Sequence, residues 1–420
     1  MALEITAARP DAALLDLPWS VPLEEWPTEY LAALPRGISR HIVRFVKVSG
    51  TVIAVKEIHA ELAVREYNTL RFLRKIGQPC VEPFGVVSGR ITGDGQELDA
   101  CLLTRHLHFS LPYRVLFSQS LRPDTAQRLI DALAVLLVKL HLAGFWWGDV
   151  SLSNTLFRRD AGAFAAYLVD AETGEIRNRL SDGQREHDLE IARVNIAGEL
   201  MDLEAGGLLT VPADAIEVSQ TIVDRYRSLW RELTESERFE DGHRWRVDER
   251  IRRLNELGFD VDELTVCTDI DGTTIKIHPK VVDAGHHSRR LLRLTGLDVE
   301  ENQARRLLND LDAYGASQDR QNDDEASVAQ DWLSQIYEPV TRSVPRDLTS
   351  KLEPAEVFHE VLEHRWYLSE NAGHDIPITE AIADYVKRVL PEKPDEAAVL
   401  GVDTGEMPVT MPSEQGWPGR

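Results

Sequence analysis

The chain has 420 residues, of which 43% are hydrophobic, so it is long enough to form two domains with buried cores. Asp and Glu outnumber Lys and Arg by 70 to 47, which gives a formal net charge of −23. Because this charge repels phosphate backbones and anionic headgroups, the composition excludes broad binding to nucleic acid or to an anionic membrane. It does not exclude a local basic pocket for a small anion.

Cysteine usage and the N-terminal residues indicate a cytoplasmic protein. The three cysteines, Cys80, Cys101 and Cys267, are far apart and too few for a disulfide framework, which fits a reducing compartment. The first residues lack a basic start followed by an apolar core, so no secretion signal is expected. The longest apolar run, around 129–147, is interrupted by polar residues and predicts a buried helix rather than a membrane span.

The first part of the chain predicts a strand-rich segment followed by a helix-rich one. Residues 1–34 are Pro-rich and irregular, and 41–48 and 51–58 then predict two strands joined at a Ser49-Gly50 turn. The elements expected next are a helix over 61–77, strands over 81–87 and 100–107, a helix from Asp124 to Gly144, a strand over 165–170 and a helix over 185–207.

Beyond residue 235 the chain changes character and becomes mostly helical. Residues 243–259 look helical and 265–282 predict a hairpin. Further helices are expected at about 299–314, 327–341, 354–371 and 378–390. Residues 392–420 are rich in Pro, Gly and acids, so they are expected to be disordered.

The first part also carries a lysine and a glutamate that are suited to each other. Lys56 lies at the end of a predicted strand, and Glu66 lies in the helix that follows. Glu66 shares the inward helix face with Leu70 and Leu73, where an unpaired carboxylate would be costly. Pairing with Lys56 removes that cost, whereas Glu61, the rival acid, lies on a polar face.

Three more polar residues complete a set with a definite chemistry. Asp149 and Asn154 follow the long apolar helix at a spacing of acid-x-x-x-x-amide, and Asp170 ends an apolar strand. Phosphoryl transfer needs a cation for the donor phosphates, carboxylate and amide ligands for magnesium, and a base near the acceptor hydroxyl. The five residues supply these groups in a definite order along the chain.

At these residues the sequence resembles the protein-kinase-like superfamily. The strand AVK, ending at Lys56, resembles the strand whose lysine pairs with a helix glutamate. GDVSLSN, residues 148–154, resembles the catalytic loop of the lipopolysaccharide (Kdo) kinase branch, and LVDAE, residues 168–172, resembles the metal-binding segment usually written Asp-Phe-Gly. The match covers about residues 36–230, and the whole chain resembles a bacterial kinase-like family with an extra C-terminal domain.

The resemblance implies an α+β fold with two lobes and a second domain. After an N-terminal extension over 1–34, a kinase-like domain is expected over 35–235, with a small antiparallel-sheet lobe to about 107 and a helical lobe beyond it. A mostly helical domain particular to its own family should follow over 236–391, and a tail over 392–420.

The resemblance also implies a function for each residue of the set. Asp149 would be the catalytic base, Asn154 and Asp170 would bind Mg²⁺, Lys56 would hold the phosphates of ATP, and Glu66 would orient Lys56. The implied reaction is phosphorylation of a hydroxyl, on a small molecule, a sugar or a lipid-linked sugar, with ATP as donor. Asp188 resembles a helix acid that braces the catalytic loop through backbone amides.

Several departures favour an atypical kinase over a conventional protein kinase. The phosphate-covering loop should be rich in glycine, but LPRGISRHI offers one, Gly37, so Ser39 and Arg40 are expected to contact the phosphates instead. Trp147 stands two residues before Asp149, where many protein kinases have histidine, and Ala171-Glu172 replaces Phe-Gly. No Ala-Pro-Glu segment is visible, which argues against a peptide-docking activation segment.

Each of the five residues has a simpler structural interpretation, and the set supports a rival function. Lys56 alone could be an edge-strand lysine, and the polar residues near 149–154 could cap a turn. The rival function is a catalytically silent nucleotide-binding module, a pseudokinase whose second domain recruits a partner. The complete charged set favours the enzyme, and the missing glycine-rich loop favours the module.

Two further segments admit a catalytic or metal-binding interpretation. Asp269-Ile-Asp271-Gly-Thr273 looks like the nucleophile segment of a haloacid-dehalogenase-type phosphatase, but strand-like alternation after it favours a hairpin turn. The pairs His359 with Glu363 and Glu360 with His364 could each share a helix face and bind a metal. The zinc-protease pattern fails at Glu363, so an ion-paired helix face is favoured.

A cluster of arginines also stands out against the acidic composition. It comprises Arg289, Arg290, Arg293, Arg305 and Arg306, beside His286 and His287 in an expected loop. Such clusters usually pair with local acids, but a contact with phosphate or with a partner protein through Arg289, Arg290 and Arg293 is the alternative.

Overall fold

The structure is a computed structural model of the chain. It describes residues 3–7, 11–32, 41–118, 125–208, 214–234, 237–240, 249, 252, 259–268 and 274–397. The expected helix over 243–259 lies almost entirely outside these ranges, as do Asp124, Ser39, Arg40 and the Asp269–Thr273 segment. No helix in these ranges is both long enough and apolar enough to cross a membrane.

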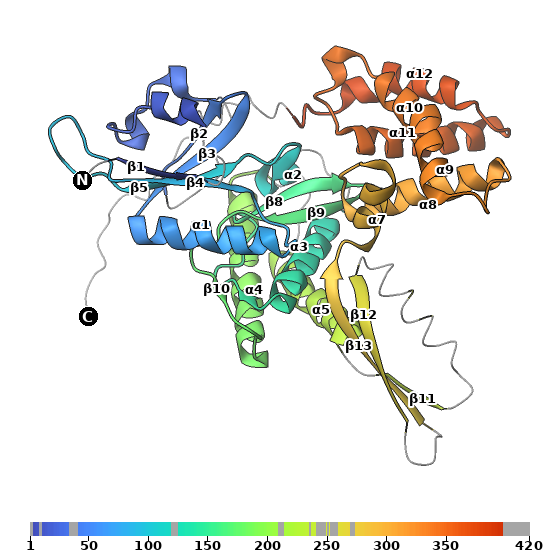
Figure 1. Cartoon of the computed structure of the whole chain (residues 1–420), viewed down its shortest axis with the longest axis horizontal. Coiled ribbons are helices and arrows are strands. Elements are labelled where there is room, and N and C mark those ends of the chain that lie inside the picture. Colours follow the sequence, from blue (N-terminus) through green and yellow to red (C-terminus); the bar gives the residue numbers. More distant parts are fainter. Residues whose placement is uncertain are drawn as a thin grey trace.

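The N-terminal lobe is an antiparallel sheet with one helix packed against it (Figure 1). The sheet has the strand order β1-β4-β5-β3-β2, and α1 spans Ala60–Lys75. The strands are β1 (Glu4–Ala7), β2 (Val43–Val48), β3 (Thr51–Ile58), β4 (Pro83–Ser88) and β5 (Ala100–Arg105). The predicted hairpin is confirmed, and Ser49 and Gly50 make its turn with φ of 45° and 83°.

The N-terminal extension is a layer of this lobe and not merely an irregular leader. It adds β1 to the sheet edge next to β4 and packs Trp19 and Trp26 into the core of the lobe. The fully buried Arg90 donates hydrogen bonds to the carbonyl oxygens of Trp19 (3.0 Å) and Val21 (2.7 Å). These bonds fix the extension to the sheet. Sequence patterns missed β1 because four residues are too few to show alternation.

The second lobe is mainly helical. Its helices are α2 (Tyr113–Ser118), α3 (Thr125–Leu142), α4 (Asp182–Ala205) and α5 (Ala215–Thr234). Its short strands are β6 (Ser110–Pro112), β7 (Phe145–Trp146), β8 (Thr155–Asp160), β9 (Ala163–Leu168) and β10 (Glu175–Ile176). The helices expected near 124–144 and 185–207 are confirmed, and α3 carries the core of the lobe. The fold is therefore bilobal and kinase-like, as the sequence predicted.

The last part of the described chain is mostly helical, with one small sheet. Strands β11 (Glu237–Glu240), β12 (Phe259–Thr268) and β13 (Thr274–Ala284) form that sheet, which confirms the expected hairpin. The helices are α7 (His286–Thr295), α8 (Glu301–Ser317), α9 (Glu325–Trp332), α10 (Glu338–Arg342), α11 (Pro354–Ala372) and α12 (Ile378–Arg388), and a π-helical turn links α9 to α10. His286 and His287, expected in a loop, begin α7.

The helical domain is bound to the β8–β9 hairpin of the second lobe through partly buried ion pairs. Arg158 binds Glu300 (2.8 Å) and Glu353 (2.5 Å), and Arg159 binds Glu396 (2.5 Å). These arginines lie on β8, the strand that begins directly after Asn154. The helical domain is therefore joined to the lobe at the strand that leaves the predicted catalytic loop.

The tip of the same hairpin is held by hydrogen bonds. The buried Asp160 accepts from the backbone amide of Gln303 (2.7 Å) and from the side chain of Asn302 (2.9 Å). The amide of Ala161 donates to Glu356 (2.9 Å). Burial raises the pKa of Asp160 to about 7. Because its carboxyl is enclosed by the second domain, the two domains share one polar junction.

Candidate active site

A cleft of about 820 Å³ contains all five predicted residues of the set. Lys56 and Glu66 come from the N-terminal lobe, and Asp149, Asn154 and Asp170 come from the helical lobe. Residues far apart in sequence therefore line one cavity between the lobes. Ser39 and Arg40, the other two predicted contacts, lie outside the described residues, so their part stays a prediction.

Lys56 is the centre of the charge arrangement in the cleft. Its Nζ lies 3.1 Å from Glu66 Oε2, 2.8 Å from Asp170 Oδ2 and 3.2 Å from Glu172 Oε2. Burial by itself lowers the pKa of Lys56, but the charges of Glu66 and Asp170 raise it overall above the ordinary lysine value. The lysine is therefore charged, and it ties helix α1 to the end of β9.

Glu66 is the most deeply buried of the three carboxylates, with 1% of its surface exposed. Burial raises its pKa to about 7, and Asp170 acts in the same direction, while Lys56 opposes it. Its Oε1 also accepts a hydrogen bond from the amide of Ala171 (3.2 Å). Glu61, the rival acid, is exposed. The inward helical spacing of Glu66 therefore correctly predicted it, rather than Glu61, as the partner of Lys56.

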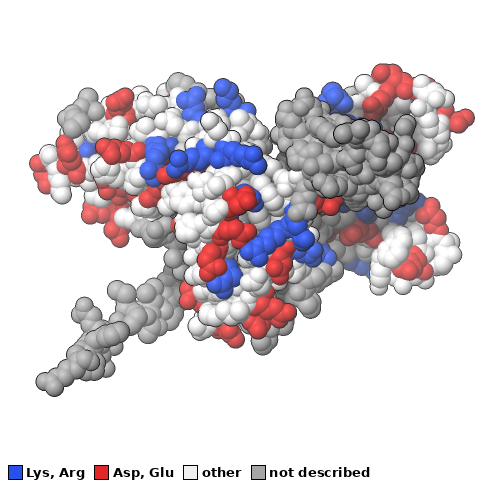
Figure 2. Space-filling model, turned by 90° about the horizontal axis from the view of Figure 1, so that it is seen from below, with Lys and Arg blue, Asp and Glu red and all other residues white. Residues whose placement is uncertain are grey.

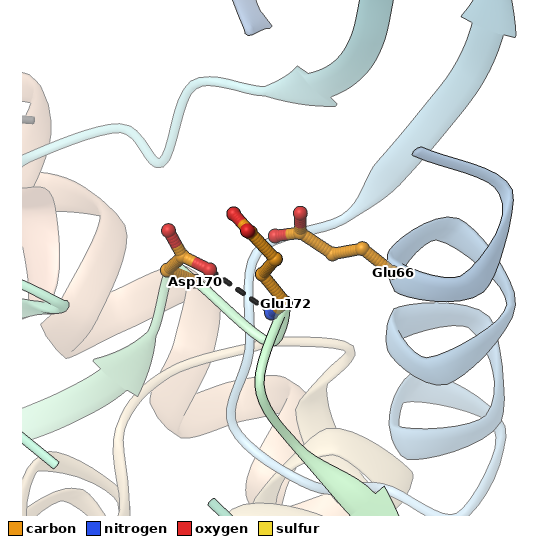
Figure 3. Close-up of side chains that lie close together, drawn as sticks. All are labelled: Glu66, Asp170 and Glu172. Atoms are coloured by element: carbon orange, nitrogen blue, oxygen red, sulfur yellow. Dashed lines mark hydrogen bonds between the residues drawn. The ribbon is translucent and has the colours of Figure 1, made fainter. Parts of the chain in front are cut away.

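Glu172, which the sequence comparison treated only as a departure from Phe-Gly, lies beside the cleft in an ion pair with Lys56. Figure 3 shows Asp170 and Glu172 on one loop, both near Glu66 of α1. Glu172 also binds His41 Nε2 (2.7 Å), just before β2. A carboxylate two residues after the predicted metal ligand was the signal that could have revealed it.

The carboxylates fit a hard divalent cation. Oxygen atoms of Glu66, Asp170 and Glu172 all lie within 4.8 Å of one another, and no other such group occurs among the residues that the structure describes. Mg²⁺ prefers carboxylate, carbonyl and water oxygens. Asn154 adds an amide oxygen to the same cleft. The donor set is therefore suited to magnesium rather than to a softer metal.

Asp149 is held by amides on both sides. Its Oδ2 accepts from Asn154 Nδ2 (3.1 Å), and its Oδ1 accepts from Asn195 Nδ2 (3.3 Å) on α4. Asn154 also binds the Asp149 carbonyl (3.0 Å). These bonds fix the direction of the carboxylate in the cleft. Asn195 was missed, because an amide in the middle of a helix gives no local signal of a role.

The loop that carries Asp149 is braced by α4. Asp188 is completely buried and accepts hydrogen bonds from the backbone amides of Trp147 and Gly148, both at 2.8 Å. His141 Nε2 contacts the same carboxylate at 3.0 Å. The brace expected of Asp188 is thus present. Glu199, which was not predicted, accepts hydrogen bonds from the backbone amides of Leu152 and Ser153 further along the loop, both at 2.8 Å.

The glycine before Asp149 has a conformational reason. Gly148 has φ of 75°, a left-handed conformation that strains residues with a side chain. A Cβ at this position would also lie 3.1 Å from the ring of Trp146. Glycine therefore suits the turn from β7 into the cleft, in keeping with Gly-Asp in place of Arg-Asp.

The alternative metal pairs on α11 do not converge. Glu360 accepts hydrogen bonds from Tyr385 and Lys393, both at 2.7 Å, whereas His364 binds Asp384 at 2.9 Å. His359 is buried and lies 3.4 Å from Glu363. These residues form separate contacts within the helical domain, in agreement with the ion-paired face favoured by the sequence.

The arginine cluster is partly paired with acids of its own domain. Arg290 binds Glu325 and lies 3.8 Å from Asp312. Arg293 is exposed on α7. A partner contact through Arg289, Arg290 and Arg293 stays a prediction.

Figure 2 shows a separate basic row over the N-terminal lobe, where α1 exposes Arg65, Arg71, Arg74 and Lys75, while acids and bases are mixed elsewhere on that face.

In comparison with known proteins, the two regions match different family models. Residues 48–197 match the model of the lipopolysaccharide kinase (Kdo/WaaP) family, and residues 228–390 match the model of a domain of unknown function, DUF4032. No curated protein matches the chain.

One similar solved structure is WaaP in complex with acyl carrier protein, with 17% identity over 61% of this chain and 99% of that chain. Its TM-score of 0.34 is too low to carry structural detail from one chain to the other. The family match covers β3, α1, the predicted catalytic loop at 148–154 and Asp170. The chain thus contains a protein-kinase-like domain that resembles the lipopolysaccharide (Kdo) kinases, followed by a region that matches the model of DUF4032.

Proposed function

We propose that this protein transfers the γ-phosphoryl group of ATP to a hydroxyl group in a magnesium-dependent reaction. The observation that supports this best is the position of Lys56, bound at once by Glu66 and Asp170 from opposite lobes, in the cavity that also contains Asp149. This arrangement can hold a triphosphate, a divalent cation and a proton acceptor together. The match to a lipopolysaccharide kinase family supports a sugar or lipid-linked sugar, or another small molecule, as acceptor.

Each residue of the cleft would have a separate role in phosphoryl transfer. Lys56 would bind the donor phosphates, and Glu66 would keep Lys56 directed into the cleft. Asn154 and Asp170 would hold the magnesium ion, with Glu172 close enough to join them. The bound ion would neutralise phosphate charge. Asp149, oriented by Asn154 and Asn195, would accept the proton of the acceptor hydroxyl.

We place this reaction in the cytoplasm, where ATP is available. Cys80 and Cys101 are free buried thiols, and their pKa values are raised by burial to about 12. Such thiols are unreactive and behave as small core residues in a reducing compartment.

The test of the reaction is a search for the metabolite that gains a phosphate. The protein would be incubated with ATP, Mg²⁺ and fractionated cell extract, and the products compared by mass spectrometry with those of Asp149→Asn. Glu190→Gln, which alters an exposed ion pair with Arg193 on α4, is the matched control. A phosphorylated small molecule that forms with wild type and Glu190→Gln, but not with Asp149→Asn, is the expected result.

The second candidate is a catalytically silent nucleotide-binding module. Two observations favour it. The phosphate-loop segment has a single glycine, and Glu172 makes a third ion pair with Lys56 and also binds His41. Magnesium-dependent ATP binding without any phosphorylated acceptor, in the extract or in the protein itself, would support this module over the enzyme.

A further inference from the structure

A second cavity lies between the helical lobe and the helical domain. It has a volume of about 200 Å³, and among the described residues it shares no lining residue with the active-site cleft. One side is formed by α3 and by residues 163–166 of β9, and the other by the N-terminal parts of α7 and α8. Figure 1 shows α3 and the β8–β9 hairpin beside the start of α7. Both domains therefore contribute walls to this cavity.

The floor of the cavity is one face of α3. Val135 and Leu136 lie on this face, and Phe164 of β9 adds an aromatic ring. Arg128 and Lys139 share the face by helical spacing, one on each side of the apolar residues. A buried water needs about two to four polar partners, which such a floor does not offer. The floor therefore suits the apolar part of an organic ligand better than it suits water.

The carboxylates that border the cavity already have partners. Asp160 is enclosed by the hydrogen bonds from α8 described above. Glu301 accepts from two backbone amides at the start of α7 (2.8 and 3.1 Å). Asp131 pairs with Arg225 (2.9 Å). Because these acids are satisfied within the protein, the cavity offers little to a cationic ligand.

Lys139 is the lining cation that lacks a partner. It lies in the last turn of α3 and is half-buried, and within the described part of the chain its ammonium makes no hydrogen bond or ion pair. Arg128 donates to the carbonyl of Gly162. Arg305, a member of the arginine cluster singled out in the sequence, lines the opposite side. An apolar floor beside an unpaired ammonium and satisfied acids fits an anion with an apolar body.

We propose that this cavity binds a small organic acid, whose apolar body lies on α3 and Phe164 and whose carboxylate pairs with Lys139. The cavity is smaller than the roughly 300–1,000 Å³ of pockets for drug-sized ligands, so the ligand has the size of a short-chain fatty acid or an arylalkanoic acid. Because both domains line the cavity, the bound acid contacts both of them. This site does not depend on the proposed phosphoryl transfer, since it lies outside the cleft.

The experiment is calorimetric titration of the full chain with phenylpropionate and with phenylpropylamine, which has the same apolar body and the opposite charge. We expect saturable binding of the acid below about 10 mM and none of the amine. Lys139→Met removes the charge and keeps a long side chain, so it should weaken acid binding at least about tenfold. Lys75→Met, at an exposed lysine of α1, is the matched control and should bind the acid as wild type does.

A second variant tests the location without touching a charge. Val135 is partly exposed and lines the cavity, so Val135→Phe fills the space with a larger ring. It should abolish acid binding while the melting temperature stays at or above that of wild type.

Three outcomes would overturn the proposal. No saturable binding of the acid to wild type would show that the cavity is only a solvated gap between the domains. Equal affinity for the acid in Lys139→Met, or binding of the amine as tight as that of the acid, would show that the ammonium is not the anchor. Unchanged binding in Val135→Phe would place the acid elsewhere on the protein.

Discussion

Two charge clusters, one in the cleft and one at the junction with the helical domain, differ in what surrounds them. In the cleft cluster, Lys56 meets Glu66, Asp170 and Glu172 beside an open cavity of about 820 Å³. In the junction cluster, Arg158 and Arg159 pair with Glu300, Glu353 and Glu396, which follow in the helical part of the chain, and Glu396 also borders that cavity. Both clusters contain more acids than bases.

This difference separates charges that can bind a ligand from charges that stabilise the contact between the domains. The cleft acids can exchange Lys56 for a metal ion or a phosphate group without breaking the fold, because the cavity admits ligands. The junction charges instead join β8 to the helical domain, and burial raises the pKa of both Asp160 and Glu396 to about 7. Substitutions in the first cluster should therefore alter function, and those in the second should alter stability.

The largest expected effect is on the chemical step. Asp149→Asn removes the proton acceptor but preserves its size, and it should lower kcat about 10²- to 10⁴-fold. The melting temperature should match that of wild type, since the carboxylate of Asp149 lines a cavity. Steady-state kinetics with the identified acceptor check this, with Glu190→Gln as control. A kcat within threefold of wild type would show that Asp149 is not the base.

The next prediction concerns the stability of the fold. A substitution at the junction should cost a free energy similar in size to the effect on the chemical step. Arg158→Ala leaves the buried Glu300 and the partly buried Glu353 without their cation, and it should lower the free energy of unfolding by about 3–5 kcal/mol. Arg227→Ala, which breaks an exposed pair with Glu186, should cost about 0–1 kcal/mol. Urea denaturation measures both. Equal losses of unfolding free energy in the two variants would mean that the junction stabilises the fold no more than an exposed ion pair does.

A smaller effect is expected for Glu172. If this carboxylate helps to hold magnesium, Glu172→Gln should weaken the magnesium dependence of ATP binding on the order of tenfold, while ATP binding at saturating magnesium changes little. Titration of magnesium against fluorescent ATP measures the shift. An unchanged magnesium midpoint would assign Glu172 only to the ion pairs with Lys56 and His41.

The smallest expected effect is a pH dependence that belongs to Glu66. Its pKa is raised to about 7, so it gains a proton as the pH falls through 7 and no longer holds Lys56 by charge. ATP affinity should therefore fall several-fold between about pH 8 and pH 6 in wild type, beyond the change seen in Glu66→Gln. Identical pH profiles for the two proteins would show that the titration of Glu66 does not control binding.

The sequence predicted the cleft better than its surroundings for a physical reason. Lys56 and Glu66 follow from strand and helix periodicity, because an acid on an apolar helix face needs a partner. The end of an apolar strand marks Asp170 in the same way. These signals are local, and the structure brings the side chains together as the order of the elements required.

What the sequence could not predict depends on contacts between distant elements. Glu300, Glu353 and Glu396 look like ordinary surface acids until the helical domain is placed against β8. Asn195 acquires a role only because α4 passes beside Asp149. The small strand β1 is too short to show a period, and its presence depends on the free edge of β4.

The most direct test of the account is calorimetric titration of ATP into the full chain with and without magnesium. It should be repeated for Asp170→Asn and for Glu190→Gln as control. We predict saturable binding that requires magnesium in wild type and Glu190→Gln, and a loss of at least tenfold in affinity in Asp170→Asn. Absence of binding in wild type, or equal affinity in Asp170→Asn, would contradict the claim that Lys56 and Asp170 form a nucleotide site.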